Sequence, residues 1–249
     1  MKKTPLIISG ACGKMGRRIA RMALRDGSFS IVAAIENIES PFIGKDYGTV
    51  LKRTKLGVRV SASPIDQVKM NAVVIEFSTP DVSIRHLKEA ARSRKKVVIG
   101  TTGFSEKQRE EIRRISRSIA VVVSPNMSVC VNLLFKAVGD FAEALSKNYK
   151  VRIQEAHHIH KKDAPSGTAK ELARVVKEKG GGTKAPIKSI REGEIIGDHT
   201  VAFDSIFDTI RITHNAKTRD IFAHGSLVAA AFVRSKKKGY YSMKEVLGL

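Results

Sequence analysis

The chain of 249 residues is long enough to bury a hydrophobic core in one large domain or two modest ones. Its two cysteines exclude a disulfide framework and its apolar runs are too short to cross a bilayer, so we expect a cytoplasmic protein without a membrane partner. The net charge of +21 suits a nucleic-acid partner, but aromatic residues make up only 6% of the chain and no nucleic-acid-binding motif occurs, which favours a solvated basic surface.

Short apolar segments alternate with amphipathic segments through the first half of the chain. We predict buried strands over residues 5–9, 30–36, 72–78, 96–100 and 120–125. We predict a loop rich in glycine and proline after residue 36, and helices over residues 17–27, 81–94 and 105–118, the last with Ser105 as its N-cap. Because strands and helices alternate so regularly, this half predicts an α/β fold with a doubly wound, parallel, Rossmann-like sheet.

The pattern changes after about residue 127. A helix over residues 131–147 leads to a strand around 150–158 and a helix over 166–179, and strand-like segments follow at 187–194, 199–205 and 208–216. A helix followed by consecutive strands predicts an α+β domain with a mixed or antiparallel sheet. The helix over 219–235 is apolar on most sides and suits packing against the first domain. We therefore place the first domain at 1–127, completed by 217–249, and the second at 128–216.

A glycine-rich turn joins the first predicted strand to the first predicted helix. Gly10, Gly13 and Gly16 open that helix, where glycine lets a pyrophosphate approach the N–H groups of the helix N-terminus. The spacing is GxxGxxG rather than the more specific GxGxxG, but Glu36 ends the second strand 20 residues later, where an acid binds the hydroxyls of an adenosine ribose. These features predict a dinucleotide site, and a glycine-rich turn without a ligand is the alternative.

Two further loops follow later strands of the predicted sheet. Residues 100–104 come after the fourth strand, and residues 124–128 come after the fifth. Because ligands bind at the carboxyl ends of strands in such sheets, the small and polar residues of both loops suit contacts with a nicotinamide ribose or ring. Either loop alone is more often an ordinary turn.

The stretch EAHHIHKKDAPSGTAKEL, residues 155–172, concentrates ionisable side chains before a predicted helix. His157 and His158 end a strand and should point to opposite faces of it. Ser166 or Thr168 can cap the helix, whose free N–H groups form an anion site, and Lys161 adds a positive charge. This combination suits a carboxylate substrate that gains a proton during the reaction.

Two other interpretations of this stretch are open. His158 and His160 stand two residues apart with two acids nearby, a set that could bind a metal, but the adjacent Lys161 and Lys162 would repel a cation. We therefore expect no metal site. The stretch could also be an exposed loop rich in histidine and lysine that binds nothing.

The sequence resembles the dihydrodipicolinate reductase family, whose members are 4-hydroxy-tetrahydrodipicolinate reductases of the diaminopimelate and lysine pathway. The stretch EAHHIHKKDAPSGTA matches the central motif of that family almost throughout. The likeness extends to GACGKMG, FSTP, GTTGF, SPNMS, REGEIIGDHTVAF and FAHGSLVAAAF, and so runs nearly from end to end. The resemblance implies an NAD(P)H-dependent oxidoreductase that reduces 4-hydroxy-tetrahydrodipicolinate to tetrahydrodipicolinate.

The resemblance also implies roles for individual residues. His157 would be the catalytic acid/base and Lys161 a proton donor. The substrate carboxylates would be bound by His158, Ser166, Gly167 and Thr168. The cofactor, NADH or NADPH or both, would be held by Gly10, Ala11, Cys12, Gly13, Lys14, Met15, Glu36, Gly100, Thr101, Thr102, Ser124, Pro125, Asn126 and Met127. Family members form homotetramers through the sheet of the second domain, which implies a substrate-binding and oligomerisation domain here.

One departure from the family concerns the choice of cofactor. Asn37 follows Glu36 where some members carry an arginine for the 2′-phosphate of NADPH, which weakens the case for strict NADPH use. Lys45, Lys52 or Arg53 could take the place of that arginine. The sequence therefore does not select between NADH and NADPH.

Two alternative functions remain open at this level. One is a reductase of another small amino or imino dicarboxylate, similar to aspartate dehydrogenase, which would share the first domain but not the HHIHKKDAPSGTA stretch. The other is a nucleotide-sensing protein that binds nucleic acid through its basic surface. Its affinity for nucleic acid would fall steeply with salt concentration.

Overall fold

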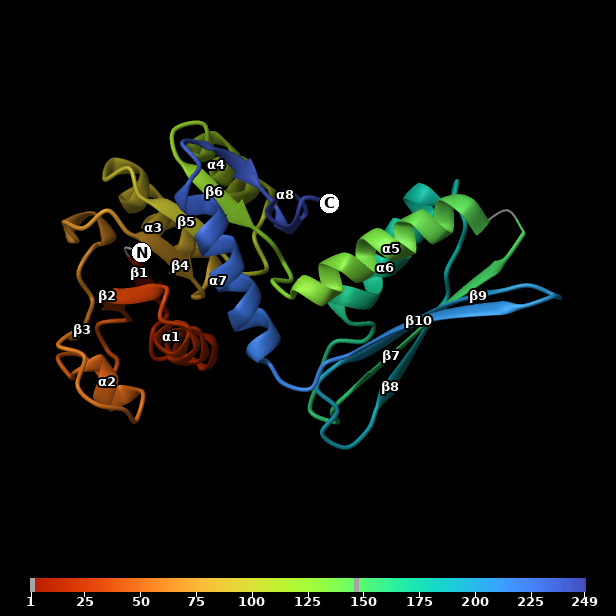
Figure 1. Cartoon of the computed structure of the whole chain (residues 1–249), viewed down its shortest axis with the longest axis horizontal. Helices are drawn as coiled ribbons and strands as arrows, with labels where there is room; N and C mark the ends of the chain where they lie inside the picture. The colour runs from red at the N-terminus through yellow and green to blue at the C-terminus, as the bar shows by residue number, and fades with distance from the viewer. Residues whose placement is uncertain (1–2, 146–147) are drawn as a thin grey trace. The chain divides into compact units, whose positions relative to one another are not determined.

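The computed structural model describes residues 3–145 and 148–249 of the chain (Figure 1). The described chain separates into two compact units. Unit 1 contains the residues up to Ser128 together with Phe222–Gly248, and unit 2 contains Val129–Ile221. Each unit has its own β-sheet.

Unit 1 is built around a seven-stranded sheet in which all neighbouring strands pair in parallel. The strands are β1 (Thr4–Ser9), β2 (Phe29–Ile35), β3 (Val60–Ser61), β4 (Val73–Glu76), β5 (Lys96–Ile99), β6 (Ala120–Val123) and β11 (Gly239–Tyr241). Their spatial order, β11-β6-β5-β4-β1-β2-β3, places β1 between β2 and β4. The carboxyl end of β1 is therefore the topological switch point of a doubly wound sheet. The predicted Rossmann-like fold is confirmed.

Capping residues in the sequence account for helix ends in unit 1. The helices of this unit are α1 (Lys14–Asp26), α2 (Tyr47–Val50), α3 (Pro80–Arg92), α4 (Glu106–Ser116), α7 (Asp220–Arg234) and α8 (Met243–Leu247). Helix α1 ends at Gly27, which adopts a left-handed conformation with a φ of 77°. Helix α4 begins with a capping box between Ser105 and Gln108, so Ser105 is the N-cap that the sequence predicted.

Two segments contain regular structure that the sequence pattern did not predict. The expected loop after residue 36 includes α2, β3 and the short 3-10 helix η1 (Ile65–Gln67), and the end of the chain forms β11 and α8. Helix α2 depends on Asp46, whose carboxylate accepts the N–H groups of Thr49, Leu56 and Gly57. These elements are only two to five residues long, so hydrophobic periodicity could not reveal them.

The core of unit 1 explains why its strands are continuous apolar runs. Leu6, Ile7 and Ile8 of β1 are each at most 1% exposed, which means that both faces of the sheet are covered. One face packs against Leu87 of α3 and Ile112 of α4 in a single hydrophobic cluster. Helix α1 packs on β1 and β2. Polar groups that contact a ligand must therefore come from the strand ends and the loops that follow them.

Unit 2 has a four-stranded mixed sheet with two helices against one face (Figure 1). Strands β7 (Lys150–His157) and β8 (Ile187–Arg191) are parallel, and β9 (Asp198–Asp204) pairs antiparallel with β7 and with β10 (Thr209–Asn215). The helices are α5 (Val129–Leu145) and α6 (Gly167–Lys179), which pack against each other. The predicted mixed sheet is confirmed, and the last two residues of the helix predicted over 131–147 lie outside the described residues.

The covered face of strand β7 is apolar at the beginning of the strand and ionisable at its end. Val151 and Ile153 are buried in the hydrophobic core of unit 2. Glu155 and His157 continue the same alternation and are buried as well. His158 lies beyond the end of the strand, so it does not occupy the opposite strand face that simple alternation predicted. The covered face of β7 therefore ends in two ionisable side chains.

Candidate active site

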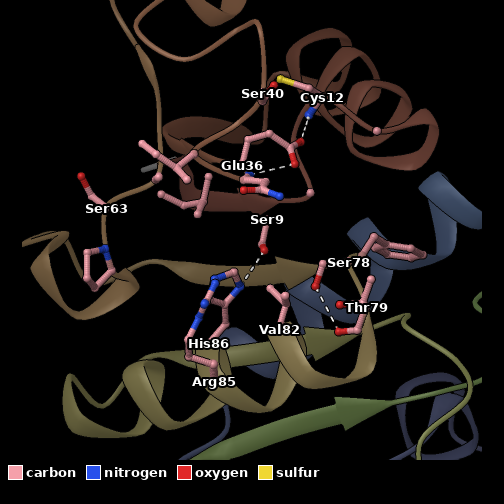
Figure 2. A pocket seen from close by; sticks show the side chains of 18 of the residues that line it. Ser9, Cys12, Glu36, Ser40, Ser63, Ser78, Thr79, Val82, Arg85 and His86 are labelled. Carbon is pink, nitrogen blue, oxygen red and sulfur yellow. Dashed lines mark hydrogen bonds between the residues drawn. The ribbon is translucent and has the colours of Figure 1, made fainter.

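A pocket of about 870 Å³ opens at the carboxyl end of the sheet in unit 1 (Figure 2). Its walls come from the glycine turn after β1, the loops after β2, β3 and β4, and helix α3. Crevices at a topological switch point are the usual ligand sites of doubly wound sheets. The pocket therefore lies where a nucleotide is expected to bind.

Close backbone contacts shape the glycine turn. Gly10 has a φ of +69°, and a Cβ atom at this position would stand 2.3 Å from the carbonyl oxygen of Phe77. A Cβ atom at Gly16 would stand 2.2 Å from the carbonyl oxygen of Gly10. Gly13 is the N-cap of α1 and has no side chain to cap the helix. The N–H groups in the first turn of α1 are therefore left for an anionic ligand.

Glu36 holds the glycine turn against the end of β2. Its carboxylate accepts the Cys12 N–H at 2.8 Å and the Asn37 N–H at 3.0 Å. Each carboxylate oxygen keeps a second lone pair, so Glu36 can still accept a hydrogen bond from a ligand hydroxyl. Figure 2 shows Glu36 and Cys12 on one side of the pocket and His86 on the other.

The predicted cofactor residues that line this pocket are Gly10, Cys12, Gly13 and Glu36. Lys14 and Met15 follow them in the first turn of α1. Ala11 is fully buried, and its carbonyl oxygen accepts the Tyr47 hydroxyl at 2.7 Å. Ala11 can therefore shape the turn, whereas Lys14 and Met15 in the first turn of α1 offer N–H groups to a ligand.

The remaining predicted cofactor residues lie in the loops after β5 and β6, and none of them lines this pocket. Gly100 packs on the Phe77 ring, since a Cβ atom at Gly100 would stand 2.1 Å from the Phe77 Cζ atom. The Thr101 hydroxyl oxygen accepts the hydroxyl of Ser83 at 2.8 Å. Both loops stand at the same edge of the sheet as the pocket. Contact between a cofactor and the predicted residues of these loops stays a prediction for Gly100, Thr101, Thr102, Ser124, Pro125, Asn126 and Met127.

Several lining residues escaped the sequence prediction, namely Ser9, Phe77, Ser78, Thr79, Arg85 and His86. His86 Nδ1 lies 2.8 Å from the buried Glu76 carboxylate. It also lies 2.9 Å from the Ser9 hydroxyl, as Figure 2 shows. The FSTP motif contains Phe77 to Thr79 and was the available signal. The sequence could not place α3 at the crevice, because that placement follows from the pairing of β4 with β1.

A second cluster of ionisable side chains lies in unit 2, at the end of β7. His157 Nδ1 is hydrogen-bonded to Glu155 Oε2, and Glu155 is fully buried. The other Glu155 oxygen, Oε1, accepts Arg191 Nη2 at 2.9 Å and the Ser166 N–H at 3.3 Å. His199 completes the cluster, with its Nε2 atom 3.1 Å from the Ser166 hydroxyl and its ring edge-on to His157.

The loop after β7 carries the predicted charged residues. Lys161 Nζ lies 2.8 Å from the Asp163 carboxylate, and the Lys161 side chain is 23% exposed. The backbone N–H of His158 donates to the Ile195 carbonyl oxygen at 2.7 Å, and the His158 Nε2 atom lies 3.3 Å from Arg219 Nη2. His160 is largely exposed. Lys161 and His158 are therefore held in place while His160 faces solvent.

The N-terminus of α6 lies against the same cluster. Ser166 is the N-cap and accepts the Ala169 N–H at 3.2 Å through its hydroxyl, so Ser166 rather than Thr168 performs the capping role. Gly167 and Thr168 form the first turn of α6, and nothing lies within 4 Å of the place where a Gly167 Cβ would stand. This open first turn can accept a carboxylate.

Burial and charge set the protonation of this cluster. Burial lowers the pKa of His157, the cations Lys161 and Arg191 lower it further, and the carboxylate of Glu155 opposes both. Burial lowers the pKa of His199 to about 4. Burial of Glu155 opposes ionisation, but the hydrogen bonds from Arg191, Ser189 and His157 together hold the pKa of Glu155 below its ordinary value. Both histidines are therefore neutral at pH 7, and Glu155 is charged.

Within residues 3–145 and 148–249, one group of side chains has the spacing of metal ligands: Glu155, His157 and His199. The Arg191 guanidinium already occupies one Glu155 oxygen, and Lys161 adds a second positive charge nearby. A divalent cation would have to displace or oppose both cations. The arrangement fits a hydrogen-bonded network better than a metal centre, and it does not contain the His158 and His160 pair considered from the sequence.

A doubly wound sheet with a glycine turn at its switch point and an acid after β2 defines a nucleotide-binding enzyme of the Rossmann class, here joined to an α+β unit. The family model of the dihydrodipicolinate reductase N-terminus matches residues 4–127, and that of the C-terminus matches residues 130–247. The chain belongs to the dihydrodipicolinate reductase family. The resemblance drawn from the motifs is confirmed.

Individual relatives agree with this assignment. A 4-hydroxy-tetrahydrodipicolinate reductase from Geobacter sulfurreducens is 39% identical, and the match covers 99% of each chain. A dipicolinate-bound dihydrodipicolinate reductase from Paenisporosarcina sp. TG-14 matches 98% of this chain and 99% of its own with a TM-score of 0.81 and 22% identity. An aspartate dehydrogenase from Thermotoga maritima has a TM-score of 0.52 and 15% identity over 95% and 98% of the chains. The last two likenesses concern the fold alone.

Family membership decides between the functions left open by the sequence. The chain is an oxidoreductase, and the predicted 4-hydroxy-tetrahydrodipicolinate reductase activity is confirmed. The likeness in fold to aspartate dehydrogenase explains why the first domain alone could not exclude that alternative. The distinguishing residues lie in unit 2, which carries the HHIHKKDAPSGTA stretch.

Proposed function

We propose that unit 1 binds a reduced nicotinamide dinucleotide and that unit 2 binds the cyclic dicarboxylate substrate of the reductase. In terms of the domains predicted from the sequence, residues 1–127 with 217–249 would bind the dinucleotide. Residues 128–216 would bind the substrate. The observation that carries the proposal is the cluster in which buried His157, paired Lys161 and the open N-terminus of α6 adjoin one another. A diacid that must be oriented and protonated needs these three groups.

The residues of unit 2 supply orientation and protons to the reaction. The first turn of α6, with Ser166, Gly167 and Thr168, binds a substrate carboxylate, and His158 binds beside it. When bound, the dinucleotide would supply a hydride for C4 of the ring, once water has been lost from the hydroxylated form. Lys161 or His157 then gives a proton to the ring carbon that has become electron-rich. The ion pair with Asp163 fixes the position of the Lys161 ammonium, which carries the proton to be donated.

The pocket of unit 1 favours NADH as the cofactor. The Glu36 carboxylate can accept hydrogen bonds from the 2′- and 3′-hydroxyls of an adenosine ribose, and its charge repels a 2′-phosphate. Lys45, Lys52 and Arg53, which the sequence offered as phosphate ligands, do not line the pocket, whereas Arg85 does. Gly10 to Met15 bind the pyrophosphate in this scheme. The loops at Gly100 to Thr102 and Ser124 to Met127 contact the nicotinamide end.

The proposal predicts which cofactor is consumed. With the substrate generated in situ by the preceding synthase, NADH oxidation should proceed with a lower KM than NADPH oxidation. Glu36→Gln removes the charge and should lower the ratio of kcat/KM for NADH over NADPH by about 10-fold, the effect of roughly 1.4 kcal/mol of differential binding. Absorbance at the reduced-nicotinamide band measures both rates. Glu39→Gln, an exposed acid on the same loop, is the control and should leave the ratio unchanged.

Two outcomes would contradict this scheme. Oxidation of neither cofactor by the wild-type protein would reject the proposed function. A cofactor ratio that is the same in wild type and Glu36→Gln would reject the role of Glu36 while leaving the activity intact.

We also propose that unit 2 assembles the chain into a homotetramer, as its family resemblance implies. The tip of the β9–β10 hairpin supports this, because Ile206 and Phe207 are 91% and 88% exposed. Light scattering should give four times the 27.3 kDa of one chain, and the double variant Ile206→Ser with Phe207→Ser should give smaller species. A wild-type mass of 27.3 kDa at micromolar concentration would contradict the proposal. The cytoplasmic location stays a prediction, and no helix in the described residues is long and apolar enough to cross a membrane.

A further inference from the structure

We propose that Glu155 is a positioning residue that fixes His157 in the tautomer with its proton on Nδ1, so that Nε2 is the nitrogen free to react. This inference rests on the proposed acid/base role of His157, in which the neutral ring accepts a proton at Nε2 before it can give one to the substrate. It adds a residue, a tautomer and a reacting atom to that role.

The partners of Glu155 determine which way the hydrogen bond to His157 runs. Glu155 is fully buried, and an ionised carboxylate can only accept hydrogen bonds. Its Oε1 atom accepts Arg191 Nη2 at 2.9 Å and the Ser166 N–H at 3.3 Å, and its Oε2 atom lies against His157 Nδ1. Arg191 keeps the carboxylate ionised and in place. His157 Nδ1 must therefore donate, and the neutral ring has its lone pair on Nε2.

The surroundings of Nε2 agree with this assignment. A Cβ atom at Gly197 would stand 3.0 Å from His157 Nε2, so the glycine leaves space on that side of the ring. Among the described residues, His199 makes no hydrogen bond to the His157 ring: its Nε2 atom lies 3.1 Å from the Ser166 hydroxyl, and its buried Nδ1 atom has no hydrogen-bond partner. The charged and titratable groups that act on the His157 ring are Glu155 from β7, Lys161 from the following loop and Arg191 from β8. His199 from β9 packs edge-on to it.

The same geometry predicts an unusual outcome for Glu155→Gln. The amide oxygen of the new side chain must face Arg191 and the Ser166 N–H, because both are donors. The amide NH₂ is then left facing His157 Nδ1 and donates to it. The proton of the neutral ring moves to Nε2, which loses its lone pair. A nearly isosteric change thus inverts the tautomer of His157 instead of merely weakening a contact.

The test measures the tautomer and the rate separately. Nitrogen-15 chemical shifts of His157 should report Nδ1–H in the wild type and Nε2–H in Glu155→Gln. The value of kcat should fall by about 100-fold or more in Glu155→Gln, while KM for NADH should stay within about 2-fold. Glu155→Asp keeps a carboxylate and should retain the Nδ1–H tautomer with a smaller loss of kcat. Glu192→Gln, an exposed acid beside Arg191, is the control and should match the wild type in both readouts.

Several results would overturn the proposal. They are an Nε2–H tautomer in the wild type, an unchanged tautomer in Glu155→Gln, or a kcat for that variant close to wild type. If Glu155→Gln does not fold, Gly197→Ala tests the reacting atom, because it covers Nε2 and leaves Glu155 in place. Its kcat should fall with KM for NADH unchanged, and a wild-type kcat would overturn the assignment. Absence of turnover in the wild type would reject the proposed function instead, and the chemical shifts would still decide the tautomer.

Discussion

Replacement of Lys161 by methionine is expected to lower kcat by about 100-fold to 10,000-fold, the range that a positioned general acid contributes. Methionine keeps the length of the side chain but cannot carry the proton that the structure holds in the ion pair with Asp163. The substitution also removes a positive charge next to the open N-terminus of α6, so KM for the dicarboxylate should rise. Binding of the dinucleotide belongs to unit 1 and should not change.

The measurement is steady-state kinetics combined with fluorescence titration of NADH. Lys162→Met is the matched control, because Lys162 is the adjacent residue in the chain and its side chain is exposed. It should keep the wild-type kcat. His157→Ala should also lose most turnover and keep its affinity for NADH. A kcat near wild type in Lys161→Met or in His157→Ala would remove that residue from the proposed chemistry.

Replacement of Gly225 by alanine is expected to destabilise unit 1 by about 3 kcal/mol or more, at the upper end of the cost of overpacking a core. Gly225 is buried in α7, and a Cβ atom there would stand 1.6 Å from the carbonyl oxygen of Met127. Met127 cannot move away freely. It is itself buried, and it follows a turn in which the Ser124 hydroxyl donates to the Asn126 carbonyl oxygen at 2.7 Å.

Urea unfolding followed by circular dichroism measures this effect. Gly167→Ala is the matched control, because nothing lies within 4 Å of the place where its Cβ would stand. Alanine has the higher helix propensity, so the control should be neutral or slightly stabilising. If the free energy of unfolding of Gly225→Ala lies within about 0.5 kcal/mol of the wild-type value, the close approach of α7 to Met127 does not exist in solution. In a folded variant, weaker NADH binding would place Met127 in the cofactor site.

The sequence by itself predicted the elements and the chemistry that local patterns encode. Continuous apolar runs such as the one around Leu6 to Ile8 indicated buried parallel strands, because both faces of such strands are covered. Ser105 indicated a helix N-terminus through its hydroxyl, and Gly10 indicated a turn that a side chain could not enter. The HHIHKK stretch carried enough specific residues to indicate the family. Each of these inferences depends on residues close together in the chain.

Only the tertiary structure determines which residues that are far apart in the sequence come into contact. The pairing of β4 with β1 brings Phe77 and His86 to the glycine turn, and the pairing of β8 with β7 brings Arg191 to Glu155, a residue 36 positions away. In the sequence, Glu155 is only one of the two acids near the His158 and His160 pair that could serve as a metal ligand, and no local pattern indicates a role for Arg191, Gly197 or Gly225. Strand order and register follow from the packing of the whole core, and no local window of residues contains that information.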